Sequence, residues 1–488
     1  MVCTWLKKIP WGTVSILFLS QLWQSCGMSA MIGYLPPLIH QFGVPWVDVG
    51  IYKGVTLSLT SGAYMASTLI AGFLIDCIGS VNFFIACTFF QAVVMVFAAF
   101  SYNLPWVYAA SLLIGLVSCN RTAAKVIGVQ ISDESIESKV MNYGVSVPYQ
   151  IGLLLGPALG GFLVVPADQY PTFFSKGSFF DIFPTLLPNL FIGFFIATTF
   201  YLSLCSFSAR KREHSESPET DELLTNYDDI SNEVEDSPNN NSTTNHGEDL
   251  GDRGGFNESH GTSFLRMLRN FATSRNSLLI MPLCFICGLV GDPTLNVYSL
   301  WMYTPNDDGG MGFSPLKYAQ FKLYASLIVM SFDLFLPVVL LQIFSKRQCL
   351  SGSYVVLVLA TGISWLPSRL NNKTLSFVTS LIIFVVCRMP IAVIKVTQVI
   401  LLKNIFPKET HGRIIGLATC IGGAGKLVGY MITGVSFAWS LSNLKTTSAY
   451  HHFPLNEAFT FLLLSFFALC GVFAGMMLTD AAEQLETD

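Results

Sequence analysis

Charged residues are scarce in this chain of 488 residues. Asp, Glu, Lys and Arg make up 12% of it, whereas apolar residues make up 52% and the mean hydropathy is +0.54. Such a chain has too few polar side chains to cover a water-soluble globule, so the composition excludes an ordinary soluble protein. Apolar runs of about 20 residues, each long enough to cross a bilayer as a helix, recur along the chain. The sequence therefore predicts an all-α protein embedded in the lipid bilayer.

Twelve such runs divide into two groups of six. They lie near 12–35, 51–75, 82–101, 106–129, 140–165, 186–207, 277–303, 318–344, 350–367, 374–402, 411–440 and 456–479. The segment 208–275 between the groups holds nearly half of the acidic residues and few large apolar ones. It cannot bury enough surface to fold alone, so we expect a disordered linker. The predicted organisation is a six-helix domain over 1–207, the linker over 208–275 and a second six-helix domain over 276–488.

Reactive constellations are also missing from the sequence. No span carries a His, Asp and Cys cluster of the kind that holds a bare zinc ion, and no nucleophile is paired with a base. We therefore expect no metal, no cofactor, no nucleic-acid partner and no enzyme activity. A monomer that moves a small molecule across the bilayer is the favoured interpretation, ahead of a membrane enzyme or a scaffold.

Basic residues are distributed unequally between the two sides of the predicted bundle. The side that carries both termini and the linker holds most of the loop Lys and Arg residues, whereas the opposite side holds only five. Those five are Lys176, Lys317, Arg369, Lys373 and Lys445. Because loops rich in Lys and Arg stay in the cytosol, both termini and the linker are predicted to be cytosolic.

The fourth and tenth predicted spans carry four cations, and the eleventh adds Lys426. Arg121 and Lys125 share a helix face one turn apart, and Arg388 and Lys395 lie in the tenth span. A charge at a span centre costs about 2.5–3.5 kcal/mol on insertion scales, so such residues usually face a cavity or a partner. Lys125 is close enough to a helix end to reach the interface instead, and the same alternative is open for Arg121.

Two aspartates are the candidate counter-charges for these cations. Asp292 lies in the seventh span and Asp333 in the eighth. A carboxylate in a cavity that opens and closes is a candidate proton carrier, although a purely structural Arg–Asp pair is equally compatible with the sequence. The neutral side chains of Gln24 and Asn296 are predicted to line the same cavity. Four cations against two acids favour an anionic or zwitterionic solute.

A dense glycine motif marks the fifth span. It reads GLLLGPALGG and includes Gly152, Gly156, Pro157, Gly160 and Gly161. Glycines four residues apart let helices approach closely, and the proline bends the helix. The string resembles the Gly-Pro motif of drug:proton antiporters in the major facilitator superfamily. Gly72, Asp76 and Gly79 resemble a loop motif of the same superfamily, but the basic residues of that motif are absent here.

Longer stretches narrow the resemblance. GIYKGVTLSLTSGAYMASTLIAGFLIDCIG and VYSLWMYTPNDDGGMGFS look like the zinc-induced facilitator-like branch, which is related to tetracycline exporters. The resemblance implies the twelve-helix fold of two pseudo-symmetric domains and transport of small organic solutes by alternating access, generally as an antiporter that exchanges protons. It implies that the four cations line the solute path. A non-coupled facilitator or a solute sensor of the same fold is the alternative.

The linker contains a candidate sorting signal. ETDELL places Glu219 ahead of Leu223 and Leu224 in the acidic dileucine pattern that cytosolic clathrin adaptors bind. Patterns of six residues also arise by chance. With the vacuolar members of the resembling family, the pattern favours a vacuolar or lysosome-like membrane over the plasma membrane.

Overall fold

A computed structural model describes residues 10–131, 140–216, 275–405, 411–445 and 454–478 of the chain. Within these ranges the secondary structure is helical, with no β-strand, and eleven segments are long and apolar enough to cross a membrane. The predicted all-α membrane class is confirmed.

The first half of the chain supplies six predicted spans. The helices are α2 (Trp11–Gln41), α3 (Trp46–Ile78), α4 (Ser80–Ala99), α5 (Leu104–Val117), α6 (Asn120–Gln130), α8 (Val147–Leu163) and α11 (Leu186–Glu216). A π-helical turn over Asn142–Ser146 precedes α8, and two short helices, α9 (Pro166–Gln169) and α10 (Phe179–Ile182), lie between α8 and α11. The fourth predicted span corresponds to one apolar segment, Leu104–Gln130, in which a short turn at Ser118 and Cys119 forms a break between α5 and α6.

The second half supplies the other six spans. Its long helices are α14 (Arg275–Tyr303), α15 (Pro315–Ile343), α16 (Lys346–Gly362), α17 (Lys373–Ile405), α18 (His411–Lys445) and α19 (Phe459–Met476). Short 3₁₀ turns over Asn306–Asp308 and Leu366–Arg369 lie in its connecting loops. Each predicted span of this half corresponds to one helix.

Helix α2 is long enough to cross a membrane, but it is not among the eleven apolar segments. It has 31 residues, but polar side chains lower its hydropathy, among them Gln21, Gln24, Ser20, Ser25 and Ser29. These side chains are buried, so the polar groups of α2 face protein. The prediction of a span over 12–35 rested on length, and α2 has that length.

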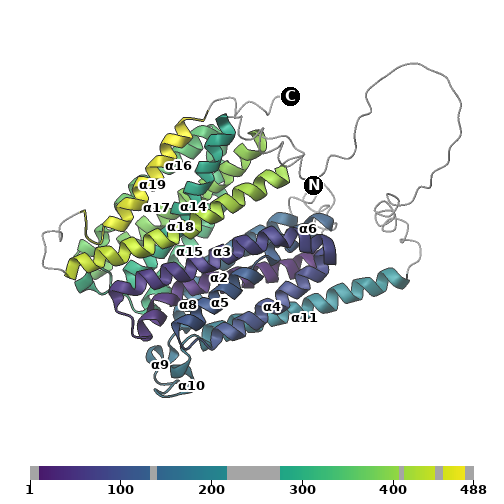
Figure 1. Cartoon of the computed structure of the whole chain (residues 1–488), viewed down its shortest axis with the longest axis horizontal. Helices are drawn as coiled ribbons and strands as arrows, with labels where there is room; N and C mark the ends of the chain where they lie inside the picture. Colours follow the sequence, from purple (N-terminus) through teal and green to yellow (C-terminus); the bar gives the residue numbers. More distant parts are fainter. Residues whose placement is uncertain (1–9, 132–139, 217–274, 406–410, 446–453, 479–488) are drawn as a thin grey trace.

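The two halves lie side by side, with the helices running between two ends of the bundle (Figure 1). The linker end is the one where α2 and α14 begin and α11 and α19 finish. The far end carries α9, α10 and the loops that join α2 to α3 and α14 to α15. This division agrees with the two-domain fold that the sequence predicts.

The glycine motif packs α8 against α2. A Cβ on Gly152 or Gly156 would overlap backbone atoms of α2, and Gly33 of α2 lies directly against the backbone of Pro157. Ser29 on α2 donates a hydrogen bond to the carbonyl oxygen of Gly152 (3.0 Å). Close backbone approach of this kind depends on small residues, because any side chain would hold the helices apart.

Hydroxyl groups join the two halves on the side of the far end. Ser58 donates to the carbonyl oxygen of Leu427 (2.9 Å), Ser326 to that of Leu154 (2.5 Å) and Tyr303 to that of Gly33 (2.8 Å). A Cβ on Gly50 or Gly434 would also overlap the backbone of the facing helix. These residues lie near the middle of their helices or closer to the far end. The halves are therefore held together most closely at the far end.

Some predicted features fall partly or wholly outside the described residues. Helix α11 continues to Glu216, nine residues past the predicted domain boundary at 207, and α14 begins at Arg275. Residues 217–274, with Glu219, Leu223 and Leu224 of the sorting pattern, lie outside the described part of the chain. The backbone at Asp76 is helical, but its side chain is also outside that part. Gly72 has open space around it and Gly79 adopts φ +82° between α3 and α4.

We predict that Gly156→Leu destabilises the protein by about 1–3 kcal/mol or more, because the new side chain has to displace the backbone of α2. Thermal unfolding of the purified full chain in detergent measures the effect. Gly416→Ala on α18 is the control, since nothing lies within 4 Å of the added Cβ, and it should match or slightly exceed the wild type. Equal unfolding temperatures for Gly156→Leu and the wild type would show that the α2–α8 contact is not tight.

Candidate functional site

One carboxylate is shared by two lysines inside the second half of the bundle. Asp292 on α14 lies 3.3 Å from the Nζ of Lys395 on α17 and 2.6 Å from the Nζ of Lys426 on α18. Asp292 thus joins three different helices through one side chain. With two cations for one anion, this ion cluster of Asp292, Lys395 and Lys426 keeps a net positive charge.

The ion cluster is reachable by solvent although it lies near the middle of its helices. The side chains of Lys395 and Lys426 are 41% and 36% exposed, and that of Asp292 is 20% exposed. Arg388 lies two helical turns before Lys395 on α17 and is buried. Its charge interacts with that of Asp292. Asp333 on α15 interacts with the charges of Arg388 and Lys395. Both predicted acids therefore lie near both predicted cations of the tenth span.

Three buried polar atoms of the predicted charged site residues have no hydrogen-bond partner in the part of the chain that the structure describes. The Nε of Arg388, the Nε of Arg121 and the Oδ1 of Asp333 have no hydrogen-bond partner among the described residues. A buried donor without a partner costs about 1–3 kcal/mol. Two arginine donors without partners are what a ligand with acceptor oxygens would satisfy.

The break between α5 and α6 positions Arg121. Gln24 on α2 donates to the free carbonyl oxygen of Ser118 (2.8 Å). The side-chain Nδ2 of Asn120 donates to the hydroxyl groups of Ser20 on α2 (3.1 Å) and Thr88 on α4 (3.2 Å). These bonds satisfy the polar groups that the break exposes, as buried backbone requires. Gln24 thus supports the break from which Arg121 projects.

Arg121 packs on an aromatic ring. Its guanidinium carbon lies 3.7 Å from the centre of the Tyr149 ring on α8. Such a cation–π contact holds the cation without neutralising its charge. Lys125, one turn further along α6, is exposed. Lys125 is thus the more exposed of the two cations, and its charge still interacts with that of Arg121.

Tyrosines link the Arg121 side of the bundle to the ion cluster. Tyr149 interacts electrostatically with Lys426 and with Tyr430 on α18. Tyr64 on α3 interacts with Arg121, Tyr149 and Lys426. The polar groups of both halves therefore face one another across the domain interface.

Asn296 lies apart from the ion cluster, one turn further along α14. It is fully buried, and its amide nitrogen donates to Thr433 on α18 (3.3 Å). Among the described residues no group of three His, Cys, Asp or Glu side chains is placed to hold a metal ion.

Sequence reasoning underrated three lysines. The sequence places Lys426 in the eleventh span without assigning it to the site, but in the structure it makes the shortest contact with Asp292. Lys53 on α3 and Lys322 on α15 were not singled out, yet both are buried. Each lies within a few residues of the start of its predicted span. A lysine in that position normally reaches the interface, so only the tertiary packing shows that these two do not.

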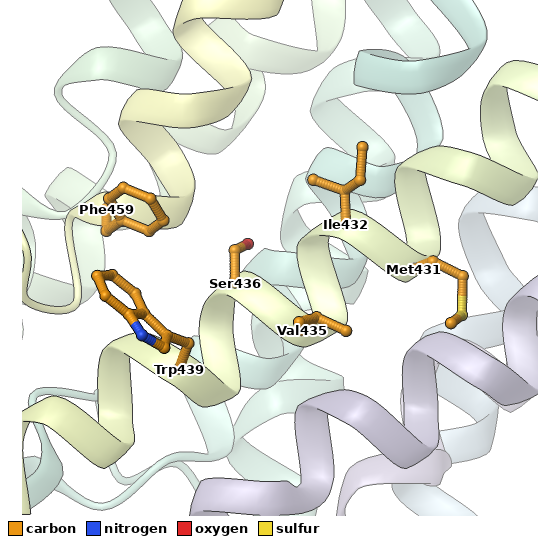
Figure 2. Close-up of a pocket in the computed structure, with 6 residues that line it drawn as sticks. All are labelled: Met431, Ile432, Val435, Ser436, Trp439 and Phe459. Carbon is orange, nitrogen blue, oxygen red and sulfur yellow. The ribbon is translucent and has the colours of Figure 1, made fainter.

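A pocket on the outer face of α18 and α19 is apolar (Figure 2). Its lining residues are Met431, Ile432, Val435, Ser436, Trp439 and Phe459. Three of them, Met431, Val435 and Trp439, are exposed. The pocket carries no charged side chain and does not include the ion cluster, so it is not suited to a charged solute.

Comparisons with known proteins identify the family. The model of the Major Facilitator Superfamily matches residues 17–430. Protein ZINC INDUCED FACILITATOR 1 of Arabidopsis thaliana is 25% identical over 444 residues, which cover 89% of this chain and 85% of that protein. Protein ZINC INDUCED FACILITATOR-LIKE 1 of the same plant is 27% identical over 308 residues, 61% of this chain and 56% of that protein. These relatives confirm the resemblance to the zinc-induced facilitator-like branch.

Solved structures agree on the fold. A D-xylose-proton symporter has a TM-score of 0.66 at 11% identity, over 98% of this chain and 99% of its own. A bacterial homolog of the human lysosomal transporter Spinster, in an inward-facing and unoccupied conformation, has a TM-score of 0.63 at 12% identity, over 98% and 97%. The protein is thus a membrane transporter rather than an enzyme, and the chain belongs to the major facilitator superfamily.

Proposed function

We propose that this protein is a proton-coupled secondary transporter of a small organic solute that carries an anionic group. The observation that carries the proposal is the ion cluster, in which one partly exposed carboxylate is shared by two lysines. The unpartnered Nε atoms of Arg121 and Arg388 support it, because they offer donors to an anionic or zwitterionic ligand.

The ion cluster gives a physical basis for coupling. When Asp292 is ionised, it occupies Lys395 and Lys426 and competes with an anionic solute for them. A proton on Asp292 removes that competitor and leaves two lysines to bind the solute. Binding of the proton and binding of the anion therefore favour each other, and by linkage the effect is reciprocal.

The sign of this coupling distinguishes classes of solute. For a purely anionic solute, proton and solute bind together and move in the same direction. Proton antiport, which the family resemblance implies, requires a solute whose positive group competes with the proton for Asp292, as a zwitterion would. If solute uptake responded to a pH gradient in neither direction, the protein would be a non-coupled facilitator or a solute sensor.

The contacts between the halves support alternating access. The halves are tied together near the far end, whereas the ion cluster remains partly exposed, so we infer a conformation open toward the linker end. Small residues and single hydroxyl bonds are among the contacts at the far end, and each hydroxyl bond contributes only about 0.5–1.5 kcal/mol. The opposite conformation would open the far end and close the linker end around the same central cations.

The solute itself is identified by comparing metabolites. Membrane vesicles prepared with and without the protein are analysed by untargeted mass spectrometry, and we expect an organic anion or zwitterion to differ between them. The vacuolar or lysosome-like membrane is the first to test, and the plasma membrane the second. That solute is then used in proteoliposome uptake.

We predict that Asp292→Asn uncouples transport from protons. The amide resembles the protonated carboxyl group and leaves Lys395 and Lys426 available at every pH. Solute exchange between equal pools should persist, whereas accumulation driven by an imposed pH gradient should be lost. Asp307→Asn, at an exposed acid of the far-end loop, is the control. If gradient-driven accumulation survived in Asp292→Asn but was lost in Asp333→Asn, Asp333 would be the proton carrier instead.

We predict that Arg388→Gln and Arg121→Gln each weaken solute uptake at least tenfold. A charge-assisted hydrogen bond contributes about 1.5–3 kcal/mol, which corresponds to about one to two powers of ten in affinity. The apparent KM for uptake is the measurement, and Lys176→Gln, on a side chain that is 79% exposed, is the control. If uptake and its pH dependence were untouched in both arginine variants, the assignment of the solute path would be wrong.

We predict that both termini and the linker face the cytosol, as the distribution of Lys and Arg indicates. An epitope tag at the C-terminus should be accessible to antibody in inside-out vesicles only. A tag inserted at Gly177, in an exposed far-end loop with nothing within 4 Å of an added Cβ, should show the reverse accessibility. The opposite pattern of antibody access would show that the protein has the reverse orientation in the membrane.

A further inference from the structure

Two lysines are buried at the interface between the halves, away from the ion cluster. Lys53 on α3 is 0% exposed and Lys322 on α15 is 6% exposed. They belong to opposite halves of the bundle, and their charges interact. Both lie in the part of their helix next to the far end, where the halves are held together.

Neither lysine has an acidic partner within the described ranges of the chain. Lys53 donates to the hydroxyl group of Ser299 and, at 3.5 Å, to the carbonyl oxygen of Asn296. The Nζ of Lys322 lies 4.3 Å from the centre of the Phe384 ring. Among the described residues, no carboxylate is within ion-pair distance of either. Buried charges are normally paired, because an uncompensated charge of this kind is expensive to keep out of water.

The two lysines continue the row of cations that begins at the ion cluster. Phe384, under Lys322, and Arg388 are one turn apart on α17, and the charges of Lys322 and Arg388 interact. Cations therefore follow one another from Lys395 and Lys426 through Arg388 to Lys322 and Lys53. The two acids whose charges interact with Arg388 and Lys395, Asp292 and Asp333, lie toward the linker-end part of this row.

A structural role explains why Lys53 is buried, but it does not explain Lys322. Its two hydrogen bonds to α14 tie α3 to the other half, as a latch would. Within the described part of the chain Lys322 makes no such bond; its Nζ packs on an aromatic ring, which does not cancel its charge. Two like-charged side chains are buried together, and one of them has no polar partner among the residues that the structure describes. Such a pair points to a negatively charged ligand.

We propose that Lys322, with Lys53 behind it, is a second anion-binding site that receives a carboxylate or phosphate group of the transported solute. This inference rests on the proposed function and sharpens its solute class. If one anionic group binds at Arg388 and the ion cluster, the second lies about one helical turn, or 5–6 Å, further toward the far end. The solute is then a small organic molecule with two anionic groups.

Two probes of equal chain length test the number of anionic groups. Succinate carries a carboxylate at each end of four carbons, and butyrate carries one. The purified full chain in detergent is heated with increasing concentrations of each salt at constant ionic strength. We expect succinate to raise the unfolding temperature in a saturable manner, with an apparent Kd at least tenfold lower than that of butyrate. No saturable effect of succinate on the wild type would overturn the inference.

The variants locate the second site. Lys322→Met should reduce the advantage of succinate over butyrate to less than threefold, whereas Lys322→Arg should retain it. Lys176→Met, at an exposed far-end lysine, should behave as the wild type. If Lys322→Met kept the full succinate preference, Lys322 would be a structural residue and the inference would fail. Arg388→Gln tests the proposed function separately, because it should weaken the binding of both probes.

Discussion

The sharing of Asp292 by two lysines is the interaction on which the rest of the site depends. In a bilayer a charge needs a partner, and here a single carboxylate serves Lys395 and Lys426 from two other helices. The pairing holds α14, α17 and α18 in one arrangement. It leaves a surplus of positive charge, which Arg388 increases. A site with a fixed positive surplus and partial exposure to water attracts anions, and its charge changes when the one carboxylate takes a proton.

The polar character of α2 has the same origin as the irregularity of the fourth span. The break between α5 and α6 frees backbone and side-chain polar groups that lipid cannot satisfy. Gln24 and Ser20 of α2 bind them, so α2 has to carry polar residues and loses hydropathy as a result. Arg121 follows the break directly and stacks on Tyr149. One local departure from helical geometry thus accounts for polar residues on α2 and lies next to the arginine of the site.

Much of the fold could be predicted from the sequence, because hydropathy runs and glycine spacing are local signals. The sequence also indicated the intramembrane charges Arg121, Arg388, Lys395 and Asp292. It could not indicate their partners, since Lys426 and Asp292 are 134 positions apart (426 − 292) and meet only through the packing of α18 on α14. The importance of Lys53 and Lys322 was hidden for a related reason. Their distance from the helix end suggests an interfacial lysine, and only the packing of the two halves buries them.

Burial of these lysines connects solute binding to the closing of the far end. Lys53 and Lys322 approach each other only when the halves come together, so their repulsion opposes closure. An anionic group between them would replace that repulsion with two attractions. The hydroxyl bonds of Ser58, Ser326 and Tyr303 are individually modest, about 0.5–1.5 kcal/mol each. The free energy of changing the interactions of a few charges is therefore comparable to that of the contacts that hold the far end closed. A solute with a second anionic group would then stabilise the closed far end by binding there, which is the differential affinity that any ligand-driven change of conformation requires.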